Sequence, residues 1–124
     1  MRLLIPLLLA VITLTGCKRN EEAFVRSVVS SVGPAILLGD AAILASQPAT
    51  KEGFPEPASV LPASFHAFAP IETWRYGQQI VIDTARHLQH RVGVVIQPVN
   101  HPEPTNGGGS RYVRIAPGIY FYES

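Results

Sequence analysis

Apolar residues dominate the first third of the chain, in three segments that polar residues or prolines separate. The first segment, residues 3–13, is shorter than the run of about 20 apolar residues that a membrane-spanning helix needs. The second follows Asn20, and its apolar residues recur at helical spacing within an arc of about 140°. Asn20 suits the N-cap, and Glu21 and Glu22 suit the positive end of the helix dipole. A helix is therefore predicted over residues 20–32.

The third apolar segment, residues 35–45, follows Gly33 and Pro34, which end or kink the preceding helix. Asp40 is its single charged residue, so a helix here is apolar on nearly all sides. A buried helix and a helix lying on a membrane surface both fit this pattern. Residues 46–64 then carry four prolines among small and charged residues, which predicts an extended linker that lets the C-terminal part stand away from the membrane.

Residues 70–92 carry the strongest periodic pattern, and it predicts a helix that begins at Pro70 and ends at Gly93. The apolar residues that fall within an arc of about 120° on this helix are Ile71, Trp74, Val81, Ile82, Ala85, Leu88 and Val92. A strand is the competing interpretation, because residues 80–82 are β-branched and apolar residues alternate from Trp74 onward. The strand would leave residues 83–91 unexplained, so the helix is preferred.

Three strands are predicted in the last third of the chain, at residues 93–99, 111–115 and 119–123, where β-branched and aromatic residues lie between turn residues. The predicted fold class is therefore α+β, with an N-terminal helical segment, a Pro-rich linker, and one helix packed on a small, mostly antiparallel sheet. The predicted divisions are a signal peptide (1–16), a lipidated N-terminus with an apolar helical segment (17–45), the linker (46–64) and a small α+β module (65–124).

The motif Leu14-Thr15-Gly16-Cys17 follows the first apolar segment and holds the single cysteine of the chain. Together with the basic start at Arg2, it gives the three-part layout of a secretory signal. This segment resembles the lipobox of bacterial lipoproteins. The resemblance implies cleavage between Gly16 and Cys17, a diacylglycerol on the Cys17 sulfur, and a fatty acid such as palmitate on the new amino terminus.

Two or three acyl chains would hold the mature protein on a membrane, since each buried methylene contributes about 0.8 kcal/mol. In Gram-negative lipoproteins an Asp after the acylated cysteine tends to retain the protein at the inner membrane. Lys18 and Arg19 follow Cys17 here. The resemblance therefore implies an outer-membrane protein that faces the periplasm.

Charge and composition exclude some classes of function. The chain has 10 Lys and Arg against 9 Asp and Glu, a net charge of +1, so it lacks the basic surplus of a nucleic-acid-binding protein. With Cys17 acylated, no thiol remains for a disulfide, and packing alone must stabilise the fold. The mature chain is long enough for one small domain.

A metal site is the strongest chemical candidate. On the predicted helix, Asp83, His87 and His90 would share one face, with His101 as a fourth ligand from a loop. A solvated helix face is the simpler interpretation, since Glu72, Gln79 and Arg86 lie on the same side and the motif lacks the glutamate of a zinc protease. We therefore expect neither a metal nor, beyond the covalent lipid, any cofactor.

Signals for catalysis are weak. The glycine run at residues 107–109 lacks the Lys-Ser or Lys-Thr pair of a phosphate-binding loop, and neither Ser64 nor Ser110 sits in a nucleophile elbow. The protein is therefore predicted not to be an enzyme.

The last predicted strand is a candidate binding surface, because Tyr120, Phe121 and Tyr122 are consecutive and Tyr112 lies upstream. If this strand lies at a sheet edge, its aromatic side chains could anchor a partner, whereas core packing is the plainer alternative. The sequence thus predicts a lipid-anchored envelope protein with an interaction or structural role, as an accessory part of a secretion, conjugation or surface-assembly complex. A periplasmic metal-binding or hydrolytic protein using Asp83, His87 and His90, and a membrane-perturbing lysis-type lipoprotein driven by residues 28–45, are the alternatives.

Overall fold

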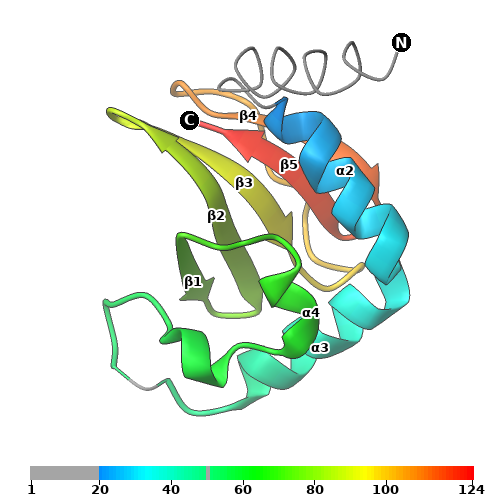
Figure 1. The fold of residues 1–124 in the computed structure, drawn as a ribbon, viewed down its shortest axis with the longest axis vertical. Coiled ribbons are helices and arrows are strands. Elements are labelled where there is room, and N and C mark those ends of the chain that lie inside the picture. The colour runs from blue at the N-terminus through cyan, green and yellow to red at the C-terminus, as the bar shows by residue number, and fades with distance from the viewer. Residues whose placement is uncertain (1–19, 50) are drawn as a thin grey trace, which may run out of the picture.

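Helices cover one face of a five-stranded antiparallel sheet in the computed structural model, which describes residues 20–49 and 51–124 (Figure 1). The helical elements are α2 (Glu21–Val32), α3 (Pro34–Ser46), the 3-10 turn η1 (Ala58–Val60) and the short α4 (Ala63–His66). The strands are β1 (Glu72–Tyr76), β2 (Gln79–His87), β3 (His90–Ile96), β4 (Arg111–Ala116) and β5 (Ile119–Glu123). The predicted α+β class is confirmed.

The first helix forms as its sequence pattern predicts. The Asn20 side chain accepts a hydrogen bond of 3.1 Å from the backbone N–H of Ala23, and the buried residues of α2 are Val25, Val28 and Val29. Gly33 then adopts a positive φ of 100°, and Pro34 starts α3 at an angle of 92° to α2. Glycine and proline therefore turn the chain so that two helices can cover one sheet face.

Helix α3 is apolar on most of its surface but buries only one side. Leu37, Ala41 and Leu44 face the core, while Ile36 and Ile43 remain more than half exposed. Within residues 20–49 and 51–124, no single helix has the length and apolar character to cross a membrane, although the bent pair α2 and α3 meets those criteria by length and composition together.

One hydrophobic core joins the helices to the sheet, and its sheet residues include Ile82, Val94 and Phe121. The N-terminal helical segment and the predicted C-terminal module are therefore one packed unit. The segment between them is not a free tether: Leu61 is buried, and the Glu56 backbone N–H donates to the Thr73 carbonyl at 2.8 Å. Prolines do prevent long helices here, but they leave the chain free to pack against β1.

The predicted helix over residues 70–92 is wrong, because this stretch forms β1, β2 and the start of β3. Apolar residues of β2 alternate between the two sheet faces: Ile80 and Ile82 enter the helix-side core, and Val81 lies on the opposite face. Both faces of this strand are buried, so its apolar residues follow one another without polar residues between them. Several of them therefore also fall within one arc when the stretch is wound as a helix.

The three predicted C-terminal strands correspond to β3, β4 and β5, but β5 is not an edge strand. The sheet order is β1-β2-β3-β5-β4, so β5 lies between β3 and β4, and the edges are β1 and β4. Residues 97–110 carry the chain from β3 past the position of β5 to the sheet edge. This non-sequential order cannot be read from the strand pattern alone.

Candidate functional site

The sheet face opposite the helices, which we call the open face, carries a second cluster of apolar and aromatic side chains. Val81, Val95, Tyr120 and Tyr122 are buried there, and Trp74 and Tyr112 pack against them half-buried. Strand pairing places these residues in register, since Trp74 pairs with Val81, Val81 with Val95, and Val95 with Tyr120. Four strands therefore contribute one continuous row of side chains.

A buried ion pair lies next to this row. Asp83 is fully buried, and its Oδ2 accepts a hydrogen bond of 2.9 Å from Arg91 Nε, with Arg91 Nη2 at 2.8 Å. The Tyr122 hydroxyl donates to the other carboxylate oxygen of Asp83. Arg91 also lies over the Trp74 ring, 5.5 Å from its centroid. The pair thus fixes Arg91 against the aromatic residues of the open face.

Gly93 makes this arrangement possible. It pairs with Asp83 on one side and with Tyr122 on the other, so it lies directly between the two groups that hydrogen-bond across it. A Cβ atom at position 93 would come within 1.8 Å of the Ile82 carbonyl oxygen. The close approach occurs beside a register shift between Asp83 and Ala85 in β2. Glycine therefore lets the strands approach and leaves space for Tyr122 to reach Asp83.

Burial of Asp83 raises the pKa of its carboxyl group, although Arg91 and Arg86 both oppose this by favouring the charged form. Arg86 lies 3.6 Å from Asp83 Oδ2 and 2.8 Å from Glu72 Oε2. Glu72 in turn accepts a 3.0 Å hydrogen bond from Trp74 Nε1. The charges of this cluster balance, so the open face near Asp83 presents oriented side chains without a large net charge.

A cavity of about 210 Å³ opens on this face beside Arg91. Its lining residues come from all five strands and the segments that flank them, and they are Tyr76, Gln79, Val81, Arg91, Val95, Ser110, Tyr112, Tyr122 and Ser124. Tyr76 is 52% exposed and stacks on Trp74, with ring centroids 6.4 Å apart and ring planes 7° apart. The cavity combines hydroxyl groups, a guanidinium and aromatic rings, which suits a side chain of a partner that has both polar and apolar atoms.

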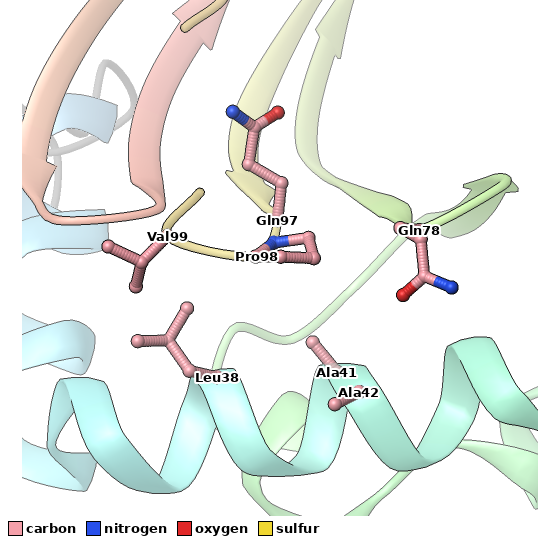
Figure 2. A pocket seen from close by; sticks show the side chains of 7 residues that line it. All are labelled: Leu38, Ala41, Ala42, Gln78, Gln97, Pro98 and Val99. Atoms are coloured by element: carbon pink, nitrogen blue, oxygen red, sulfur yellow. The ribbon is translucent and has the colours of Figure 1, made fainter. Parts of the chain in front are cut away.

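A second cavity lies on the helix side of the sheet, between α3 and the turn before β2 (Figure 2). Leu38, Ala41 and Ala42 of α3 face Pro98 and Val99 across it. Its volume is about 90 Å³, well below the roughly 300–1,000 Å³ of small-molecule sites. Gln97, which also lines it, already donates to the Pro102 carbonyl at 2.9 Å and accepts from Gln79 Nε2 at 3.0 Å. This cavity is therefore a small packing gap.

The aromatic residues predicted to bind a partner lie on the two sheet faces in the way that the alternating side chains of a strand require. Tyr112, Tyr120 and Tyr122 share the open face, and Phe121 lies in the helix-side core. Tyr120, Phe121 and Tyr122 are all buried, so the expectation of exposed aromatic area on an edge strand is wrong. Neighbouring strands flank β5 on both sides, and Tyr112 of β4 is the half-exposed member of the set. Gly16 and Cys17 lie outside the described residues.

The candidate metal ligands do not converge. Asp83 is buried in its ion pair, whereas His87 and His90 are exposed and face each other at the tip of the β2–β3 hairpin. His101 lies in an exposed turn after β3. Among residues 20–49 and 51–124, no group of three or more His, Cys, Asp or Glu side chains is placed to hold a metal ion. The helix that would have aligned these residues does not form.

Sequence reasoning missed Trp74, Tyr76, Arg91 and Gly93 as parts of one surface. A signal for the β1–β2 hairpin was present, since Gly77 precedes the β-branched run of residues 80–82. The β2–β3 turn at Leu88–Gln89 carries no such glycine, so the ion pair of Asp83 and Arg91 between these strands had no local signal.

No family model matches this chain, and neither a curated protein nor a solved structure matches it. The geometry of the open face and the N-terminal motif therefore carry the functional argument.

Proposed function

We propose that this chain is a lipid-anchored protein of the bacterial cell envelope that binds a protein partner through the open face of its sheet. The observation that carries the proposal is the cluster of Trp74, Tyr76, Tyr112 and Arg91 around an open cavity. Tyr, Trp and Arg are the residues most enriched among energetic hot spots of protein interfaces. The ion pair with Asp83 holds Arg91 in place before any partner binds, which lowers the entropy cost of binding.

The size of the cavity favours a protein partner over a free small molecule. At about 210 Å³ it falls below the usual range of small-molecule pockets, about 300–1,000 Å³, but it can receive one partner side chain. Its rim is formed by aromatic rings that extend the contact area beyond the cavity itself, since Tyr76 and Trp74 stack beside it.

The lipid anchor is supported by the Leu14-Thr15-Gly16-Cys17 motif and by the short stretch of sequence between this motif and the first helix. Helix α2 begins at Glu21, so a short connection joins Cys17 to the first turn of the domain. Lys18 and Arg19 after the cysteine favour the outer membrane, with the domain in the periplasm. A role as an accessory part of a secretion, conjugation or surface-assembly complex fits a small anchored binding domain.

The alternatives have less support from the geometry. A metal-dependent or hydrolytic function would need Asp83, His87 and His90 to meet, but Asp83 is buried in its ion pair and both histidines are exposed at a turn. A lysis-type function would need the apolar residues of α2 and α3 for the membrane, but many of them, such as Val28 and Leu37, fill the core.

In-cell photocrosslinking tests the proposal. A photoreactive residue at Tyr76, at the rim of the cavity, should give a specific crosslink to one envelope protein, which mass spectrometry can identify and reciprocal capture can verify. The same residue at Ser27, exposed on α2 and outside the sheet, should not capture that protein.

The anchor is tested in the same cells. The wild-type protein should incorporate labelled fatty acid and lose residues 1–16, and Cys17→Ser should abolish both. Equal crosslinking from Tyr76 and Ser27, or a wild-type protein that takes up no fatty acid, would contradict the proposal.

A further inference from the structure

The tip of the β2–β3 hairpin carries an exposed leucine in a backbone conformation that disfavours it. Leu88 and Gln89 form a two-residue turn between His87 and His90, and Leu88 has a positive φ of 53°. Glycine, asparagine or aspartate is the usual residue at such a hairpin position, because a branched side chain crowds the backbone there. Leu88 is also 96% exposed, so neither packing nor local conformation accounts for a leucine at this place.

This hairpin tip lies at the end of the sheet where the folded chain begins. Thr84, three residues before His87, donates to the Glu21 carboxylate at 3.1 Å, and Arg111 at the start of β4 donates to Glu22 at 3.1 Å. The first turn of α2 is thus fixed beside the sheet end from which the hairpin extends, and both lie toward the top of Figure 1. The other end of β2, at the Gly77–Gln78 turn, lies near α3 instead.

The segment between Cys17 and Asn20 limits the distance between a membrane that holds the Cys17 lipid and the end of the sheet beside α2. Asn20 lies three positions after Cys17, and an extended chain spans at most about 3.3–3.6 Å per residue, which gives a reach of about 10 Å. The hairpin extends by a similar length beyond Thr84, because each strand residue rises about 3.3 Å. With Cys17 acylated, the bilayer surface therefore comes within reach of Leu88.

We infer that the β2–β3 hairpin tip is a second membrane contact, in which Leu88 inserts into the headgroup region of the bilayer that holds the Cys17 lipid. This inference rests on the proposed lipid anchor. Gln89, His87 and His90 surround Leu88 with polar groups that can hydrogen-bond to phosphate and carbonyl oxygens of the lipid headgroups. Two contacts at one end, the acyl chains and Leu88, would stop the domain from rotating freely about its anchor.

This orientation also has a consequence for the open face. The outer side of α3, with its exposed Ile36 and Ile43, is separated from the anchor by all of α2, a helix of 12 residues and about 18 Å. The domain therefore stands on one end of its sheet rather than lying on its helices, and the open face points along the membrane surface, accessible to a partner.

A fluorescent reporter on the acylated full-length protein in vesicles of phosphatidylethanolamine and phosphatidylglycerol tests the inference. Because lipid occupies the single natural cysteine, a thiol introduced by Gln89→Cys is the one that accepts an environment-sensitive dye. The dye emission should shift to the blue and be quenched by brominated lipids. A dye introduced by Gln78→Cys, at the turn on the opposite end of β2, should behave as in water.

Leu88→Asn is the matched variant, since asparagine tolerates a positive φ and the fold should be kept, as circular dichroism can verify. With this change the reporter at position 89 should lose most of its lipid quenching while the protein still co-floats with vesicles. Equal quenching at 89 and 78, a reporter at 89 that stays in water, or quenching that Leu88→Asn does not alter would overturn the inference. A failed anchor is distinguishable, because the protein would then not co-float and the dye would also label Cys17.

Discussion

Gly93 is the residue on which the geometry of the open face depends most. The Gly93→Ala variant should lose about 3 kcal/mol of stability, since a Cβ atom 1.8 Å from the Ile82 carbonyl oxygen forces the strands apart, as in strongly overpacked cores. Urea denaturation can measure the loss.

Gly39 provides the matched control, because it lies within α3 and a Cβ atom there meets nothing within 4 Å. The Gly39→Ala variant should gain about 0.5–1 kcal/mol from its higher helix propensity. If Gly93→Ala were as stable as the wild type, the close approach of β2 and β3 would be refuted.

Asp83 gives the domain a pH dependence whose sign follows from its burial. The pKa of this carboxyl group is raised above 3.8 in the folded protein, so the folded state binds the proton more tightly than the unfolded chain. This contribution to stability is fully present below pH 3.8 and is lost as the pH rises through the raised folded pKa. Relative to the Asp83→Asn variant, the wild type should therefore become less stable over that interval.

Chemical denaturation of both proteins across a pH series measures this difference. A stability difference that does not change with pH would show that Arg91 fully offsets the effect of burial, and an opposite slope would show that it outweighs burial.

At the scale of elements, short-range sequence signals were sufficient to predict one helix and three strands. The cap at Asn20, the periodic apolar residues of α2 and the Gly33-Pro34 break were sufficient to predict α2 and its end. The strands β3, β4 and β5 were also predicted, since residues rich in β-branched and aromatic side chains lie between turn residues there.

The two N-terminal hairpins of the sheet were missed for a physical reason. Strand β2 is buried on both faces, so apolar and polar residues do not alternate along it. Its turn at Leu88–Gln89 also lacks the glycine or asparagine that marks a hairpin. The candidate metal site depended on the helix assigned to this stretch, and it was lost with the helix. Tyr120 and Tyr122 were correctly placed on one face because alternation is a local property.

At the scale of the whole molecule, the order of strands decides which residues are accessible. The sequence could not show that residues 97–110 lead the chain to the sheet edge and leave β5 between β3 and β4. This order buries Tyr120 and Tyr122 and leaves the exposed aromatic surface to Tyr76 on β1 and Tyr112 on β4, with Trp74 beside them. The helices and the sheet share one core, and the segment predicted as a tether packs against the domain through Leu61.

The central claim is that the open face, and not the helical face, binds the partner. Its most direct test is the affinity of the crosslinked partner for two variants whose altered residues are similarly exposed: Tyr76→Ala on the open face and Ile43→Ala on α3, 52% and 57% exposed in the wild type. We expect Tyr76→Ala to weaken binding about tenfold, equivalent to about 1.4 kcal/mol, and Ile43→Ala to leave the Kd unchanged. A Kd that rises with Ile43→Ala and stays constant with Tyr76→Ala would contradict the account.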